Sequence, residues 1–190
     1  MVYLSRWHFR IAVLLLVAVA SAAACQGKED EAIRTARIYD LLTALPRATL
    51  KAPASDYISA STGTVAKEQR RALYMVPTSR AEFPPVKVEQ DSILTFAIGI
   101  QDDAWDKSGD GVEFTALIRG SDGKETKVFS RYVDPKHIEQ DRHWIGVRIP
   151  LRQFAGQTIR VVLSTSPGPA SNNDYDWAFW AEPEIVLAGQ

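Results

Sequence analysis

Aromatic side chains gather late in the sequence, beside carboxylates and amides. They are Trp105, Trp144, Tyr175, Trp177 and Trp180. A pyranose ring offers C–H groups to an aromatic face and hydroxyls to polar side chains, so this combination of residue types suits the binding of a sugar. The alternative is that all of these residues pack in a core, because aromatic side chains dominate the interiors of β-sandwiches.

The segment from residue 176 to residue 182 indicates which aromatic residues would meet a ligand. In an extended strand the side chains alternate between two faces, so Trp177 and Phe179 share one face. The other face carries Asp176, Trp180 and Glu182. We therefore expect Trp177 in the core, and Trp180 over an exposed groove with two carboxylates beside it.

A polar loop precedes this segment. Asn172 and Asn173 follow the turn-forming run Pro167-Gly168-Pro169, and loop tips on a rigid scaffold commonly carry binding residues. A purely structural turn is the alternative. The predicted ligand-binding residues are Trp105, Asn172, Asn173, Tyr175, Asp176, Trp180 and Glu182.

Four acidic residues lie close together in another predicted loop. They are Asp102, Asp103, Asp106 and Asp110. Residues 106–111 resemble the first half of a calcium loop, in which oxygens at alternate positions converge on a hard cation. Leu117 stands where an EF-hand has its bidentate glutamate, which excludes that motif. A looser calcium site is the prediction, and calcium is the one cofactor that the sequence indicates; a solvated loop is the alternative.

Few residues are suited to catalysis. Beyond the N-terminal segment the histidines are His137 and His143, and the chain lacks the Gly-x-Ser-x-Gly, HExxH, CxxC and phosphate-loop motifs. Glycan hydrolysis by two carboxylates is the enzymatic alternative. It has no specific support, because a chain with 23 acidic residues always offers a pair. We predict no catalytic residue and a protein that is not an enzyme.

The first 24 residues have the features of a secretory signal. Arg6 and Arg10 precede an unbroken apolar run over residues 11–20, and small residues follow that run. A membrane-spanning helix needs about 20 apolar residues, so a retained span is the weaker interpretation.

Cys25 is the only cysteine and stands where the signal would be cut. Ala22-Ala23-Ala24-Cys25 resembles the lipobox of bacterial lipoproteins, in which the cysteine is diacylated and becomes the mature N-terminus. Ala22 departs from that motif, which usually has leucine there. The resemblance implies an exported protein, anchored through a lipid on Cys25 at the periplasmic face or the cell surface. A plain secreted protein with an unused thiol is the alternative.

The charge of the chain argues against nucleic acid as a partner. The formal net charge is −1, and it is about −3 without residues 1–24, which contain two arginines and no acid. Nucleic-acid binding proteins usually present a strongly basic face.

Hydrophobic spacing predicts one helix followed by many strands. Residues 31–45 are expected to form a helix that Pro46 ends. Beyond residue 70, extended runs alternate with turn residues and no helix intervenes, which favours an antiparallel sandwich or barrel. The expected strands are residues 57–59, 72–76, 92–100, 112–119, 126–132, 144–149, 157–165, 176–180 and 184–187, with a turn over residues 120–123.

Four segments carry a resemblance to a known group of domains. They are SILTFAIG from residue 92, GDGVEF from residue 109, IPL with FAGQ from residues 149 and 154, and DWAFW from residue 176. With them, residues 71–186 resemble the jelly-roll, galactose-binding-like modules of bacterial envelope proteins and carbohydrate-active enzymes. The resemblance implies a mainly β fold, an antiparallel jelly-roll β-sandwich, which here would carry a short N-terminal helix.

The chain is thus expected to divide into a signal peptide (1–24), a lipidated tether with an N-terminal extension (25–70) and a β-sandwich domain (71–190). The expected function is a lipid-anchored, non-catalytic module that binds carbohydrate or another cell-envelope component. The alternative is a structural or protein-interaction lipoprotein of the envelope without a sugar ligand. That alternative predicts that Trp144, Trp177 and Trp180 are all buried.

Overall fold

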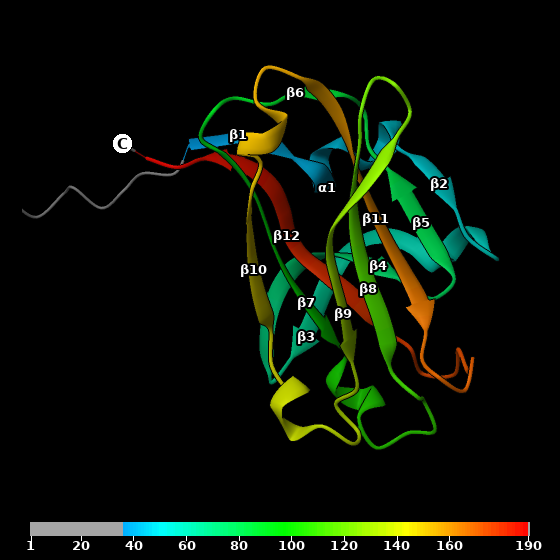
Figure 1. Cartoon of the computed structure of the whole chain (residues 1–190). Coiled ribbons are helices and arrows are strands. Elements are labelled where there is room, and N and C mark those ends of the chain that lie inside the picture. Colours follow the sequence, from blue (N-terminus) through cyan, green and yellow to red (C-terminus); the bar gives the residue numbers. More distant parts are fainter. Residues whose placement is uncertain (1–35, 190) are drawn as a thin grey trace, which may run out of the picture. The chain divides into compact units, whose positions relative to one another are not determined.

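The structure is a computed structural model that describes residues 36–189, and these residues form a β-sandwich of two antiparallel sheets (Figure 1). The first sheet has the order β10-β7-β12-β4-β3, with β1 paired to β12. The second has the order β2-β5-β11-β8-β9, with β6 paired to β11. The mainly β, antiparallel sandwich predicted from the sequence is confirmed.

The first sheet consists of β1 (Ala36–Asp40), β3 (Ile58–Val65), β4 (Glu68–Met75), β7 (Ser92–Ile100), β10 (Ile145–Pro150) and β12 (Ala178–Leu187). The second consists of β2 (Thr49–Lys51), β5 (Ser79–Glu82), β6 (Val86–Lys87), β8 (Val112–Arg119), β9 (Glu125–Val133) and β11 (Thr158–Pro167). The described residues contain one α-helix, α1 (Leu41–Ala44), and five short 3-10 turns.

The core lies between the two sheets. Strand β8 alternates between buried and half-buried side chains, as expected for a strand that covers a core with one face. Trp180 on β12 is fully buried, and the rings of Phe96 and Phe114 meet it edge-on at centroid distances of 4.9 and 5.3 Å. These three rings come from both sheets, so they join the two layers.

Within the described residues, the helix predicted over residues 31–45 is confirmed only at Leu41–Ala44, and residues 36–40 are not helical. Residues 36–40 form strand β1, which pairs with β12 from Ala36 opposite Leu187 to Asp40 opposite Glu184. Asp40 then caps the four-residue helix α1 by accepting hydrogen bonds from the backbone N–H groups of Leu42 and Thr43. Strand pairing therefore outweighs the local helical spacing. Residues 31–35 lie outside the described residues.

The predicted domain boundary after residue 70 also needs correction, because it falls inside β4. β3 and β4 form a hairpin with Ile58 opposite Met75 and Val65 opposite Glu68. β2 pairs with β5 in the other sheet. Residues 36–70 thus contribute strands to both sheets and belong to the sandwich.

The two strands expected over residues 176–180 and 184–187 are one strand, β12, whose register against β7 shifts between Ala181 and Glu184. Proline 183 lies in this irregularity, and Glu182 has a φ of 48°. No helix within residues 36–189 combines the length and the apolar character that a membrane crossing requires. Cys25 and the signal segment are not among the described residues.

Candidate ligand site

Four aromatic side chains surround a cavity of about 380 Å³ at one end of the sandwich. It is lined by Tyr57, Tyr74, Val76, Asn173, Asp174, Tyr175 and Trp177. The aromatic residues come from the turn before β3, from β4 and from the loop before β12. A cavity of this size accommodates a small ligand, and its lining combines ring surfaces with an amide and a carboxylate.

Hairpin geometry brings the first two tyrosines together. The register of β3 and β4 places Ser59 opposite Tyr74, and Tyr57 lies in the turn immediately before β3 and lines the same cavity as Tyr74. The backbone N–H of Val76 donates to the carbonyl of Tyr57 at 3.0 Å, which extends the pairing beyond the hairpin. Burial, with the nearby Tyr57 and Asp56, raises the pKa of Tyr74, so its phenol remains a neutral hydrogen-bond donor.

The other side of the cavity is a tight turn before β12. Tyr175 has a φ of 60°, and the N–H of Trp177 donates to the Tyr175 carbonyl at 2.8 Å. The two rings lie 5.7 Å apart at 60°. Tyr175 is exposed and Trp177 is half-buried against the core. The turn thus presents one ring that is exposed to solvent, that of Tyr175, and one that is fixed by packing against the core, that of Trp177.

Asn172 orients the polar side of the cavity. Its side-chain amide donates to the Ser108 carbonyl, and its Oδ1 accepts from the Asp174 N–H, both at 2.9 Å. Asn173 and Asp174 themselves are exposed and line the cavity. Asn172 is therefore a positioning residue, and Asn173 and Asp174 are available to a ligand.

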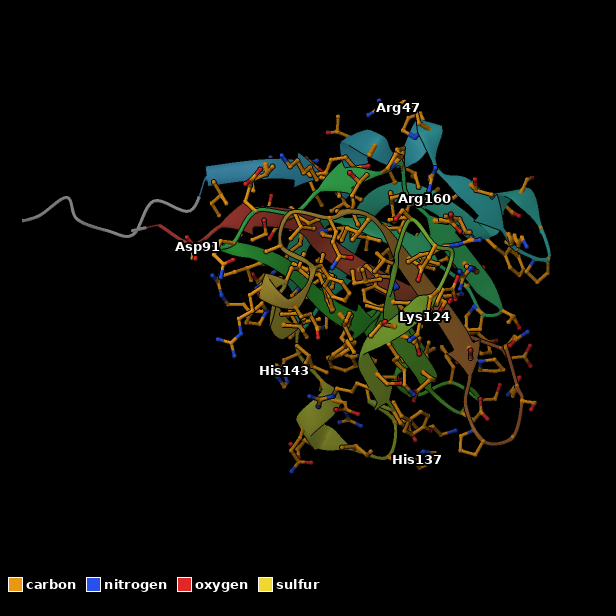
Figure 2. The ribbon with its side chains drawn as sticks, turned by 45° about the horizontal axis from the view of Figure 1, so that its top comes forward. Arg47, Asp91, Lys124, His137, His143 and Arg160 are labelled. Carbon is orange, nitrogen blue, oxygen red and sulfur yellow. The ribbon has the colours of Figure 1, made fainter. Side chains whose placement is uncertain are left out.

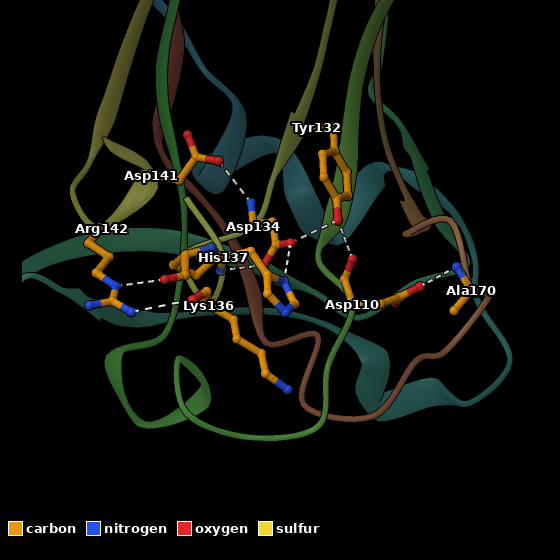
Figure 3. A network of polar contacts seen from close by, with 9 residues as sticks. Asp110, Tyr132, Asp134, Lys136, His137, Asp141, Arg142 and Ala170 are labelled. Carbon is orange, nitrogen blue, oxygen red and sulfur yellow. Dashed lines mark hydrogen bonds and ion pairs between the residues drawn. The ribbon is translucent and has the colours of Figure 1, made fainter. Parts of the chain in front are cut away.

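A polar network ties the loop of the site to two neighbouring loops (Figure 3). The single proton of the Tyr132 hydroxyl is within reach of two acceptors, the Asp110 carbonyl and Asp134 Oδ2. Asp110 Oδ2 accepts from the Ala170 N–H. Asp134 Oδ2 also contacts His137 Nδ1 at 2.7 Å. The three loops therefore hold one another in place behind the aromatic cavity.

His137 meets an acidic partner in this network, but at the surface. Its side chain is 63% exposed, and the Asp134 carboxylate also accepts from the His137 backbone N–H. His143 is exposed as well. The contacts of Asp134 are those of a carboxylate that orders its loop.

Two glycines allow the loops to approach each other closely. A Cβ on Gly168 would lie 2.1 Å from the Asp110 carbonyl oxygen, and one on Gly109 would lie 2.8 Å from the Asp174 carbonyl oxygen. Both contacts are with backbone atoms, which cannot move aside without shifting a loop. These residues are therefore required by loop packing.

We predict that Gly168→Ala lowers the free energy of unfolding by about 1–3 kcal/mol, because the added methyl group forces the 167–177 loop away from Asp110. Urea denaturation measures the change. Gly146→Ala is the matched control, because a Cβ there meets nothing within 4 Å. Equal stability losses in the two variants would contradict the assigned loop contact.

Asp176 is buried and does not lie in an exposed groove. It is 1% exposed, and its Oδ2 atom has no hydrogen-bond partner within residues 36–189. Burial, and then the negative charges of Asp110, Asp134 and Asp174, raise the pKa of Asp176 to about 7. A carboxyl group in this position is most stable in its protonated form.

The predicted position of Trp180 is wrong. The backbone turns at residues 175–178, where the N–H of Ala178 donates to the Asp176 carbonyl, and β12 begins only at Ala178. The alternation therefore cannot be counted from Asp176, and Trp180 faces the core. Trp144 is also buried at 7% exposure, whereas Trp177 borders the cavity, so these tryptophans are not all core residues.

Two further predicted ligand residues lie away from the aromatic cavity. Trp105 donates its indole N–H to the Ile100 carbonyl, and the Arg142 guanidinium lies over its ring. Glu182 borders a separate groove on the first sheet, together with Arg70 and Arg148. Of the seven predicted ligand residues, Asn173 and Tyr175 line the cavity, and Asn172 and Asp176 lie next to them.

The four carboxylates of the predicted calcium loop are not brought together. Both oxygens of Asp102 accept backbone N–H groups, from Ala66 and Lys67 at the β3–β4 turn. Asp103 and Asp106 are exposed. Within residues 36–189 no group of three or more His, Cys, Asp and Glu side chains has an arrangement that could hold a metal ion. Asp102, Asp103, Asp106 and Asp110 thus form no such group in the described residues, and calcium binding stays a prediction.

Comparisons with known proteins give a partial picture. No protein-family model matches the sequence. An uncharacterised protein of Archaeoglobus fulgidus is 40% identical over 104 residues, which are 54% of this chain and 26% of that protein. The chain thus spans about a quarter of the length of this relative.

Several solved structures have a backbone that is similar to this chain over part of its length. A CBM51 domain from Clostridium perfringens GH95, in complex with methyl-galactose, has a TM-score of 0.49 at 12% identity, over 74% of this chain and 92% of that one. The C-terminal family 22 carbohydrate-binding module of Clostridium thermocellum Xyn10B has a TM-score of 0.45 at 11% identity, over 85% and 97%. The CBM51-2 and INT domains of Clostridium perfringens ZmpB, in complex with GlcNAc, have a TM-score of 0.48 at 14% identity, over 74% and 29%.

Proposed function

We propose that this chain is a non-catalytic carbohydrate-binding module whose ligand site is the aromatic cavity. The observation that supports this function is the meeting of four aromatic rings with Asn173 and Asp174 around a volume of about 380 Å³. These rings offer flat apolar faces, and the amide and carboxylate offer the donors and acceptors that sugar hydroxyls require.

The electrostatics favour a neutral sugar. Asp174 lines the cavity, and Asp176, which is buried between the lining residues Tyr175 and Trp177 in the sequence, has its pKa raised to about 7. An anionic sugar placed there would be repelled by Asp174 and would add to the cost of ionising Asp176. Hydroxyl groups, in contrast, are good donors to a carboxylate. The proposed ligand class is therefore an uncharged pyranose at the end of a glycan.

The experiment is a glycan-array screen of the purified protein, followed by calorimetry on the bound glycan. Trp177→Ala and Tyr175→Ala are each expected to weaken binding roughly tenfold or more, because buried aromatic contacts dominate such sites. Trp105→Ala is the matched control, since its ring lies outside the cavity. The proposal fails if no neutral glycan binds, or if the Trp105 variant weakens binding as much as the Trp177 variant.

We also propose that the module is exported and carries a lipid on Cys25. The support is the signal-like segment of residues 1–24 and the small-residue run before the single cysteine. Export and acylation would place the binding domain in the cell envelope, where glycans are abundant. Labelling of the wild-type protein with a palmitate analogue, and its loss in Cys25→Ser, tests this proposal independently of ligand binding.

A further inference from the structure

A second polar groove lies on the outer face of the second sheet. It has a volume of about 510 Å³, and its floor is formed by Glu82 on β5, Arg119 on β8 and Arg160 on β11. An adjoining hollow of about 270 Å³ shares Glu82 and Arg119 and adds Arg80 and Lys51. None of the residues that line these two hollows lines the aromatic cavity.

Basic side chains outnumber acidic ones in these two hollows. Arg119 and Arg160 stand directly opposite each other in the pairing of β8 and β11, and like charges at opposed positions repel. Glu82 lies between them, 2.8 Å from Arg119 Nη1 and 3.7 Å from Arg160 Nε. Arg80 is 4.0 Å from the same carboxylate and also pairs with Glu125. One carboxylate thus serves three guanidinium groups.

The arginines remain accessible above that carboxylate. The Glu82 side chain is 16% exposed, whereas those of Arg119 and Arg160 are 40% and 43% exposed. Each guanidinium has five N–H donors in a planar fork. Arg119 donates one hydrogen bond, from Nη1 to Glu82 Oε2, and Arg160 donates one from Nη1 to the Phe83 carbonyl. Both groups therefore have donors left for a ligand.

Further positive charge lies nearby. Burial raises the pKa of Tyr39, and the positive charges of Arg47 and Arg160 oppose this rise, so both arginines lie near the Tyr39 phenol. Figure 2 shows Arg47 and Arg160 at the opposite end of the view from His137 and His143. This concentration of arginine contrasts with the formal net charge of the chain, which is −1.

We propose that this groove is a second saccharide site, in which the exposed N–H groups of Arg119 and Arg160, above Glu82, bind the carboxylate of an acidic sugar such as a uronic acid. The inference builds on the proposed carbohydrate-binding function. Guanidinium forks match a carboxylate through paired, charge-assisted hydrogen bonds. The added negative charge relieves the repulsion between the two arginines, and the volume suits one or two sugar rings. The lining contains no aromatic side chain on which a nucleobase could stack.

The test compares two forms of one polymer. Calorimetry measures binding of polygalacturonate oligomers and of the same oligomers with methyl-esterified carboxylates, to the whole protein. We expect the acidic form to bind at least tenfold more tightly at low salt, and increasing sodium chloride to reduce the difference. Arg119→Gln and Arg160→Gln should each remove most of the affinity difference between the acidic and the esterified oligomers. Arg160→Lys keeps the positive charge but not the planar fork of donors, so it should retain only part of that difference.

Control variants separate this site from the aromatic cavity. Arg148→Gln removes an exposed arginine from β10 in the other sheet and should leave acidic binding unchanged. Trp177→Ala should weaken neutral-glycan binding roughly tenfold or more and leave acidic binding unchanged, so each site can fail without the other. Equal affinity for the two polymers, equal loss in Arg148→Gln, or binding of inorganic sulfate or an oligonucleotide in place of the acidic oligomer would overturn the proposal.

Discussion

Trp180→Ala is expected to lower the free energy of unfolding by about 3–5 kcal/mol, which is a large part of the total stability of a typical domain. The side chain is fully buried and joins the two sheets through its contacts with Phe96 and Phe114. Its loss leaves a cavity at the centre of the core that the surrounding strands cannot close. Thermal and urea denaturation of the purified variant measure the effect.

A second variant keeps this prediction testable if the first does not fold. The Trp180 indole N–H has no hydrogen-bond partner within residues 36–189. Trp180→Phe removes that buried donor and keeps an aromatic ring, so it should cost about 1–2 kcal/mol and leave glycan binding intact. Loss of binding in a folded Trp180→Phe protein would show that Trp180 acts at the ligand site after all.

Asp176→Asn is expected to stabilise the protein at pH 8 by about 2–4 kcal/mol, by less at pH 5, and by little below about pH 4. The folded state holds the Asp176 proton up to about pH 7, whereas the unfolded chain releases it near 3.8. Between these values the unfolded state binds fewer protons, so the free energy of unfolding of the wild-type protein falls as pH rises. Asparagine has no proton to lose, which removes this contribution.

Urea denaturation at pH 5, 6, 7 and 8 measures the pH dependence. Asp174→Asn is the matched control, because Asp174 is an exposed neighbour that only contributes charge to the Asp176 environment. It should reduce the slope slightly and leave its sign unchanged. A wild-type stability that rises from pH 5 to pH 8, or the same slope in Asp176→Asn, would show that Asp176 is ionised in the folded state.

Strands in the middle of the chain were the most predictable part of the fold. Residues 92–100 and 112–119 form β7 and β8 with the expected bounds, because alternating β-branched and apolar residues lie between clear turns. The N-terminal region could not be predicted in this way. Ile33, Leu41 and Leu45 have helical spacing, yet pairing with β12, which is far away in the sequence, makes residues 36–40 a strand.

The candidate site was predictable only where one loop carries it. Asn173 and Tyr175 belong to a polar loop and were expected near a ligand. The sequence does not indicate Tyr57 and Tyr74, because they meet only through the pairing of β3 with β4, and residues 60–71 are not predicted as strands. Trp180 was misplaced because a single tight turn before β12 shifts the count of alternating faces.

The two ends of β12 have different neighbours. Trp177, at the aromatic cavity, immediately precedes Ala178, and Leu187 at the far end pairs with Ala36, where the described chain begins (Figure 1). A strand of ten residues is about 30 Å long. An attachment on the N-terminal side of Ala36 would therefore hold the domain at the end of β12 that is opposite the cavity. With such an attachment, the end of the domain that carries the aromatic rings would point away from the anchoring surface.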